Sequence, residues 1–250
     1  MLIVSTKKKK RIPYHDKVIA KFHKNLSALD SFILTCNPIL SGSLAVNFLY
    51  NPEISSGDVD IYFATAEDYV KCFEHFKTKD AVYYQTENAI TLPTYNLQLI
   101  SKEFLPPEEL IYTHDFVNVS VAITVDTIYT TRETHLSWYN QELVLRNFQI
   151  SENPTDAERV VALFHLANRI SKYIARYDLP LSNSFKKFFY QQLEFLNQIN
   201  PEVFKITQQE SIDYYGITVT HSSDIARIKS TITDLLEVNS HQDSLDWRPF

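Results

Sequence analysis

Glycine is scarce in this chain, which has only Gly42, Gly57 and Gly216 among its 250 residues. That is about 1%, against a usual share of about 7%. No two of the three lie close enough together to form a glycine-rich loop. This excludes a P-loop, a dinucleotide-binding G-x-G-x-x-G turn and a G-x-S-x-G nucleophile elbow, which all need glycines a few residues apart. Phosphate groups, if the protein binds them, must be held by another arrangement.

Cysteine and long apolar runs are also scarce. The two cysteines, Cys36 and Cys72, have no metal-binding spacing and are typical of free thiols in a reducing compartment. No apolar run approaches the roughly 20 residues that would span a bilayer. The N-terminal sequence MLIVSTKKKKR has too short an apolar stretch for a secretory signal. We therefore expect a cytoplasmic protein without a membrane partner. The low glycine content is also typical of an AT-rich genome, such as many phages have.

The net charge of −6 disfavours indiscriminate binding to nucleic acid. The charge is uneven, however, since residues 156–190 carry six basic and three acidic side chains, and residues 191–250 carry four basic and nine acidic ones. A basic window inside an acidic protein indicates a defined anion site. A second basic run, Lys7–Arg11, resembles a nuclear-import or RNA-contact tract, but a flexible basic N-terminus is the commoner explanation.

Hydrophobic spacing predicts two parts with different secondary structure. In the first part we expect helices over residues 14–31, 44–50, 66–77 and 106–112, and strands over 38–41, 58–64, 81–86, 89–92 and 97–101. Residues 116–124 are β-rich, and 129–147 are expected to be strand or loop. In the second part we expect long helices over 155–177, 184–198 and 222–237. The prediction is an α+β fold: a mixed sheet with flanking helices in residues 1–150 and a C-terminal helical domain in residues 151–250.

One stretch of the sheet region carries the chemistry. Gly42-Ser43 stands between an expected strand and helix, and Gly57-Asp58-Val59-Asp60 opens the next strand. Since strand side chains alternate between faces, Asp58 and Asp60 point to the same side. Two adjacent carboxylates repel each other unless a cation lies between them, and hard oxygen ligands suit Mg²⁺ or Mn²⁺. At Gly42-Ser43, a small hydroxyl and the free N–H groups of a helix start can hold a phosphate.

This pattern resembles the nucleotidyltransferase fold of the DNA polymerase β superfamily, whose core motif is Gly-Ser at a helix start followed by Asp-x-Asp on the next strand. The resemblance covers roughly residues 30–125. The later segments Asn96–Ile100, Pro107–Leu110 and Asp115-Phe116 resemble a group of nucleotidyltransferase-like proteins of phages and large viruses, and so does the helical stretch Arg169–Arg176.

The resemblance implies two-metal phosphoryl chemistry. Asp58 and Asp60 would hold Mg²⁺ on a nucleoside triphosphate, and Gly42 and Ser43 would hold its phosphates. An acceptor hydroxyl of an RNA, a protein or a small molecule would attack the α-phosphate and release pyrophosphate.

A third carboxylate usually completes such a site, and here the chain departs from the family pattern. Gln98 stands where the acid is expected. Asp115 is our substitute for the catalytic set, with Asp126 as a weaker one. His114 lies beside Asp115 and is left out of the set, because a histidine at a loop edge is more often structural.

The basic window adds a second group of candidates. Arg169, Lys172 and Arg176 follow one face of the expected helix 155–177, beside an apolar stripe. Such cations could neutralise the triphosphate or the pyrophosphate, although a solvated helix face has the same spacing. Ser43 could likewise be a simple helix cap.

Three functions remain open on the sequence. The first is a metal-dependent nucleotidyltransferase. The second is a catalytically lapsed copy of the fold that binds nucleotide or a host protein, which Gln98 favours and Asp115 opposes. The third is an unrelated α/β interaction protein with a chance Asp-x-Asp.

Overall fold

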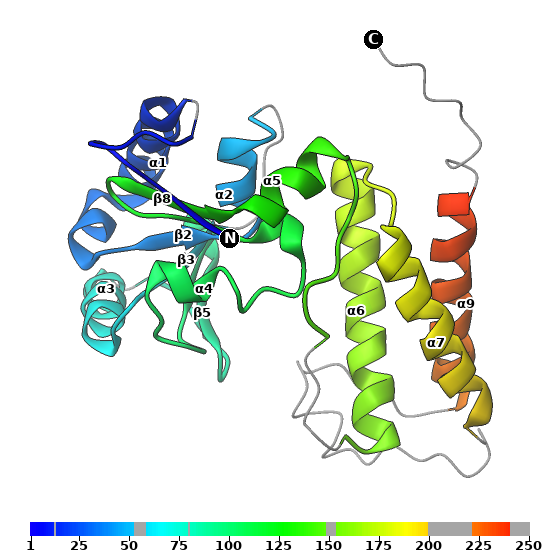
Figure 1. Ribbon diagram of the computed structural model, residues 1–250. Helices are drawn as coiled ribbons and strands as arrows, with labels where there is room; N and C mark the ends of the chain where they lie inside the picture. Colours follow the sequence, from blue (N-terminus) through cyan, green and yellow to red (C-terminus); the bar gives the residue numbers. More distant parts are fainter. Residues whose placement is uncertain (13, 53–58, 80, 149–153, 200–221, 241–250) are drawn as a thin grey trace. The chain divides into compact units, whose positions relative to one another are not determined.

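The structure is a computed structural model, and it describes residues 1–250 except 13, 53–58, 80, 149–153, 200–221 and 241–250. The chain divides into two compact units, Met1–Asn140 and Gln141–Phe250. The first unit is a sheet with helices, and the second is helical (Figure 1).

The first unit is built on a mixed sheet. Its strands are β1 (Leu2–Thr6), β2 (Ile39–Ser41), β3 (Val59–Tyr62), β4 (Tyr84–Gln85), β5 (Ala89–Leu92), β6 (Leu97–Ile100), β7 (Val121–Ile123) and β8 (Thr127–Thr131). Across the described residues they lie in the order β1-β8-β7-β2-β3-β6-β5-β4. Neighbours are antiparallel except β3 and β6, which run parallel. This mixed sheet with its helices confirms the predicted α+β class.

The helices of the first unit follow the predicted apolar spacing. They are α1 (His15–Asp30), α2 (Ser43–Leu49), α3 (Ala66–Thr78), α4 (Pro107–Leu110) and α5 (Arg132–Tyr139), with 3₁₀ turns η1 (Ser31–Cys36), η2 (Pro93–Tyr95) and η3 (Val117–Val119). In α1, Val18, Phe22 and Leu26 repeat every four residues and are buried along one face. That spacing allowed α1 to be identified from the sequence alone.

The two faces of the sheet differ, and the difference positions the candidate site. On β3, Val59 and Ile61 are buried, whereas Asp60 and Tyr62 are only half-buried. The face that carries Asp60 and Tyr62 is covered near Tyr62 by an apolar cluster that includes Ile39 of β2 and Leu110 of α4. Period-two alternation thus separates an apolar core side from a side where a polar residue can reach solvent.

Three predictions about local structure differ from the structure in whole or in part. The N-terminus is not a flexible tail, because Leu2–Thr6 pairs with the whole of β8 as an edge strand. Residues 129–147, expected to be strand or loop, contain helix α5 after β8, and Thr131 caps that helix by accepting a hydrogen bond from the N–H of Thr134. The β-rich stretch 116–124 begins with the 3₁₀ turn η3 before β7. A short edge strand such as β1 depends on a partner far away in sequence.

The second unit consists, in its described part, of α6 (Asp156–Tyr177), α7 (Asn183–Gln198) and α9 (Ser222–Ser240), which match the predicted helices (Figure 1). A capping box joins Thr155 and Glu158 at the start of α6. The helices bury apolar faces that include Val160, Leu163, Ala167, Ile170, Phe185, Phe189, Ile225 and Ile232. None of the described helices is long and apolar enough to cross a membrane.

Candidate active site

The Gly-Ser turn and the Asp-x-Asp strand come together in the structure. Gly42 is the N-cap residue of α2, directly after β2, and its backbone has φ 75° and ψ −153°. A Cβ atom at this position would lie 3.1 Å from Oδ2 of Asp60. That backbone conformation is open almost only to glycine, and the close approach of the carboxylate leaves little room for any side chain. Gly42 therefore lets the turn and the Asp60 carboxylate lie against each other. We call this place, where Gly42 at the end of β2 meets Asp60 of β3, the Gly42–Asp60 corner.

Ser43 begins α2 directly after Gly42. The first N–H groups of a helix have no acceptor within the helix and are available to an anion. Because α2 has only seven residues, these N–H groups and the Ser43 hydroxyl matter more here than the macrodipole of the helix. Oxygen ligands for a cation and donors for a phosphate thus lie side by side.

The second carboxylate of the motif, Asp58, lies outside the described residues. Within the described part of the chain, no group of three or more His, Cys, Asp or Glu side chains could hold a metal ion. Beside the Gly42–Ser43 turn, the described side chain that suits a hard cation is Asp60, whose carboxylate lies against Gly42.

Gln98 lies directly beside Asp60. The parallel pair β3–β6 places Gln98 opposite Asp60, and the antiparallel pair β5–β6 places Thr91 opposite Gln98. All three side chains are half-buried on the same face of the sheet. The strand expected to carry a third acid thus carries a neutral amide at the position nearest to Asp60.

A buried network that the sequence analysis missed supports the turn from behind. The hydroxyl of Ser41 donates to the carbonyl of Val121 at 2.7 Å and pairs with Nε2 of His114 at 2.7 Å. Since that hydroxyl hydrogen is already donated, Nε2 of His114 carries a hydrogen and donates it. The His114 ring also lies edge-on to Tyr62, with the ring centres 6.2 Å apart. In the sequence, the signal that could have indicated this network was Ser41, which directly precedes the Gly42-Ser43 motif.

Asp115 follows His114 in the turn before η3, where it is half-buried. It does not open a strand as the sequence suggested, because η3 and Ser120 separate it from β7. The role of Asp115 as a third ligand stays a prediction. Asp126 lies in the turn before β8, where it accepts a hydrogen bond from the Thr127 hydroxyl at 2.7 Å.

The predicted cations Arg169, Lys172 and Arg176 all lie on α6, in the second unit. Lys172 is exposed, and the two arginines are half-buried. Their part in binding the same substrate stays a prediction.

The far end of α2 is held by aromatic side chains. The Tyr50 hydroxyl and Nδ1 of His135 are hydrogen-bonded at 2.7 Å, and the Tyr50 ring stacks on Trp138 at 5.4 Å between centres. Burial lowers the pKa of His135, which favours the neutral form of its ring. The same burial raises the pKa of Tyr50. Both ends of α2 are thus fixed, and the position of Ser43 with them.

Neither cysteine offers a nucleophile for covalent chemistry. Cys36 and Cys72 are free, as the sequence predicted, and both are buried. Burial raises the pKa of both thiols, which holds them in the unreactive protonated form.

Three comparisons relate the chain to known proteins. The model of a family described as "Gabija anti-defense 2 family protein" matches residues 14–141, which include the Gly42–Asp60 corner and the turn of His114 and Asp115. A search of curated proteins found no match.

Solved structures with the same fold include CCA-adding enzymes. The Thermotoga maritima enzyme complexed with tRNA has a TM-score of 0.50 and 12% identity, covering 100% of this chain and 58% of that one. A CCA-adding enzyme complexed with ATP has a TM-score of 0.50 and 10% identity, covering 100% and 59%. A complex with CTP has a TM-score of 0.53 and 12% identity, covering 94% and 56%. The chain thus spans less than two thirds of these enzymes, and at such low identity the likeness shows the nucleotidyltransferase fold alone.

Proposed function

The chain belongs to the Gabija anti-defense 2 family, and we propose that it is a metal-dependent nucleotidyltransferase. It would move a nucleoside monophosphate from a nucleoside triphosphate to an acceptor hydroxyl and release pyrophosphate. The observation that carries this proposal is the contact between the Gly42–Ser43 turn and the carboxylate of Asp60. It joins donors for phosphate oxygens to a ligand for a divalent cation. The structures of similar fold determined with ATP and CTP support a nucleoside triphosphate as the donor.

In this proposal Asp60 and Asp58 hold Mg²⁺ or Mn²⁺, and the N–H groups and hydroxyl at Gly42–Ser43 hold the phosphates. A divalent cation at this site supplies charge neutralisation on the phosphate oxygens. The acceptor oxygen forms a bond to the α-phosphorus, the bond from the α-phosphorus to the bridging oxygen breaks, and pyrophosphate leaves with that oxygen. The proton of the acceptor hydroxyl passes to a base, for which Asp115 is our candidate. Arg169, Lys172 and Arg176 are proposed to neutralise the leaving pyrophosphate.

The acceptor is an RNA end, a protein hydroxyl or a small molecule. The family description names Gabija anti-defense, which makes a component of that defence the first acceptor to test and supports the expected phage origin. We propose that modification of such a component is how the protein acts.

A second candidate function rests on Gln98. An amide at the position next to Asp60 removes one negative charge from the site, and this favours a lapsed enzyme that binds nucleotide or a defence protein without transfer. Changing Gln98→Asp restores an acid at that position. If the missing charge is what limits the site, this variant transfers label where the natural chain does not.

The experiment that tests the proposal uses each α-labelled nucleoside triphosphate with Mg²⁺ or Mn²⁺ and an extract of cells that carry the Gabija defence. We expect label to move onto one acceptor, and Asp60→Asn to reduce this transfer at least about 100-fold, since removing a metal ligand removes several kcal/mol of transition-state stabilisation.

The matched control is Asp178→Asn. Asp178 is an exposed residue of the second unit with a left-handed backbone that asparagine tolerates, and the control should transfer label normally. Nucleotide binding without transfer would move the conclusion to the lapsed enzyme. Absence of both nucleotide and metal binding would contradict both functions.

A further inference from the structure

The positive charge of the first unit is concentrated at its N-terminal end. Residues 7–24 carry eight basic side chains and one acidic side chain, a net +7, whereas the rest of the chain carries 16 basic and 29 acidic ones, a net −13. The Debye length is about 8 Å at physiological salt. An anion at this segment therefore responds to the local charge, and the negative net charge of the whole chain does not exclude binding there.

The basic run is a fixed turn between β1 and α1. Thr6 and Lys9 exchange two backbone hydrogen bonds of 3.1 Å, and the N–H of Lys9 also donates to the Thr6 hydroxyl at 3.1 Å. β1 is paired with β8 along its length. The side chains Lys7–Arg11 are all exposed on this turn. They therefore form an ordered cationic surface rather than a tail.

A buried serine anchors the end of this turn. The hydroxyl oxygen of Ser5 accepts hydrogen bonds from the N–H groups of Arg11 at 3.0 Å and Ile12 at 3.3 Å. Its remaining partner is Nδ1 of His15 at 3.0 Å, to which it donates. Both Ser5 and His15 are buried. The serine therefore ties the basic turn to the first residue of α1.

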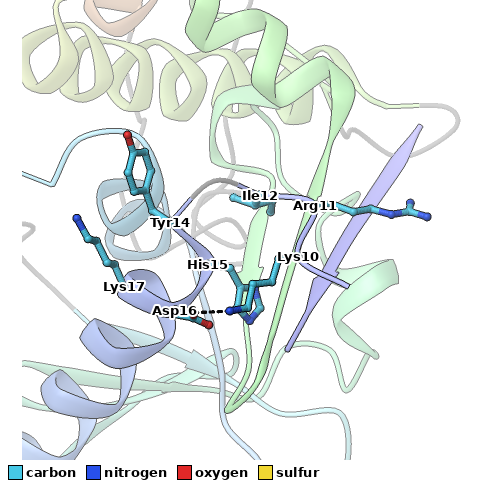
Figure 2. A pocket seen from close by; sticks show the side chains of 7 residues that line it. All are labelled: Lys10, Arg11, Ile12, Tyr14, His15, Asp16 and Lys17. Carbon is cyan, nitrogen blue, oxygen red and sulfur yellow. Dashed lines mark hydrogen bonds and ion pairs between the residues drawn. The ribbon is translucent and has the colours of Figure 1, made fainter. Parts of the chain in front are cut away.

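A pocket of about 620 Å³ that is open to solvent lies between the basic turn and the start of α1. Its lining consists of Lys10, Arg11, Ile12, Tyr14, His15, Asp16 and Lys17 (Figure 2). Tyr14 has a left-handed backbone and a side chain that is 73% exposed, and the Lys17 ammonium lies 5.2 Å from the centre of its ring. Figure 2 shows Arg11 extending to the side opposite Tyr14 and Lys17, while Lys10 pairs with Asp16.

Further lysines continue the surface along α1. Lys21 and Lys24 follow Lys17 at helical spacing on the same helix. Lys21 donates to the carbonyl of Pro52 at 3.2 Å and lies 4.8 Å from the centre of the Phe48 ring on α2. The cations are thus spread over several sites, which suits a chain of phosphates better than one small anion.

We propose that the surface formed by residues 7–12 and 14–24 binds a single-stranded nucleic acid. Lys7, Lys8, Lys9 and Arg11 contact successive phosphates, and a base stacks on the exposed ring of Tyr14. Cations that follow a backbone, combined with an aromatic ring open to solvent, are the two components by which proteins hold single strands without reading sequence. This inference does not depend on nucleotidyl transfer.

The test measures binding of a fluorescein-labelled 20-nucleotide oligo(U) and oligo(dT) to the full chain by anisotropy, without nucleoside triphosphate or metal. We expect binding of either strand that weakens with salt. For four phosphate contacts the log–log slope against salt concentration is about −3, from about −0.7 per contact on single strands. The triple variant Lys7→Glu, Lys8→Glu, Arg11→Glu should weaken binding at least about 10-fold and flatten the slope by about 2.

Controls separate local contacts from total charge. The variant Lys102→Glu, Lys187→Glu, Lys229→Glu makes the same change in net charge elsewhere and should keep binding within about 2-fold. Tyr14→Asn preserves the left-handed backbone and should weaken binding about 5-fold or more, from about 1 kcal/mol of stacking, while Tyr14→Phe should not. Circular dichroism checks that each variant is folded.

Several results would overturn the proposal: no salt-dependent binding of either strand, equal losses in the two triple variants, or equal binding of inorganic polyphosphate. Preferential binding to vesicles of anionic lipid would replace it with a membrane-surface role. Because no nucleotide is transferred in this assay, failure here leaves the proposed enzyme activity intact, and loss of transfer in Asp60→Asn leaves strand binding intact.

Discussion

The Gly42–Asp60 corner and the basic turn after β1 lie in the same unit but are built in different ways. At the corner, the pairing of the antiparallel strands β2 and β3 brings the two halves of the motif, Gly42 and Asp60, together. At the basic turn, the cations are contiguous in sequence, and what is long-range is their support, since β1 pairs with β8 more than a hundred residues away. One site is therefore assembled from separate segments with a recognisable motif, whereas the other depends on tertiary pairing to become ordered.

The largest expected effect separates the two sites completely. Asp60→Asn should reduce transfer at least about 100-fold and leave the affinity for a single strand unchanged. Lys7→Glu, Lys8→Glu, Arg11→Glu should weaken strand binding at least about 10-fold and leave transfer to a small-molecule acceptor unchanged. Both variants are measured in both assays. A loss of both activities in either variant would mean that the two regions form one site.

The next largest effect concerns the backbone of the corner. Gly42→Ala places a Cβ atom 3.1 Å from the Asp60 carboxylate oxygen on a backbone with φ 75°. We expect the free energy of unfolding to fall by about 3 kcal/mol, with a loss of transfer. Urea denaturation measures the first and the labelled-nucleotide assay the second. Ala45→Gly, further along α2, should cost only about 1 kcal/mol. Equal effects at the two positions would argue against the contact with Asp60.

A smaller effect is expected at the anchor of the basic turn. Ser5→Ala leaves the N–H groups of Arg11 and Ile12 without their acceptor, and the free energy of unfolding should fall by about 2 kcal/mol. Strand binding should weaken while transfer persists. Ser27→Ala, at an exposed position of α1, is the control and should change neither. Unchanged strand binding in Ser5→Ala would show that the order of the turn is not needed.

The smallest effect concerns the stability of the first unit at low pH, through Asp30, which belongs to neither site. Burial alone would raise the pKa of Asp30, but hydrogen bonds from Lys79, His75 and the N–H of Phe32 outweigh it and hold that pKa at about 2. The folded pKa lies below the ordinary value, so this carboxylate stabilises the fold at neutral pH, and the contribution is lost as the pH falls from about 4 towards 2.

Asp30→Asn should therefore lower the free energy of unfolding at pH 7 by about 1–2 kcal/mol and reduce its loss between pH 4 and pH 2. Transfer and strand binding at pH 7 should stay normal in this variant. A pH dependence of stability identical to that of the natural chain would contradict the role assigned to Asp30.

Much of the fold was predictable because it follows local periodicity. The helices α1, α3, α6 and α7 have apolar spacings that only one helix face can satisfy. The elements that were missed are short: β1 has five residues, η3 has three and α5 has eight. A five-residue strand has no stability of its own, and only its pairing with β8 distinguishes it from a flexible tail.

Part of the geometry of the candidate site was predictable too. Gly42, Ser43 and Asp60 were chosen because a glycine and serine before a helix, followed by acids at alternate strand positions, form a recognisable motif, and the structure brings Gly42 and Asp60 together. The family resemblance led us to expect Gln98 on a neighbouring strand, and the register of β3 and β6 places it opposite Asp60. His114 could not be assigned, because nothing local indicates that its ring reaches the Ser41 hydroxyl across 73 residues.

Local sequence determined the turn, the strand faces and the charge cluster of the two regions, because dihedral preferences, side-chain alternation and contiguous charge act within a few residues. Tertiary structure decided how those residues are used. It placed the Asp60 carboxylate against Gly42, put an amide beside it, and fixed the basic run through a buried serine. These outcomes depend on strand pairing and burial between distant segments, whose energies exist only when the chain has folded.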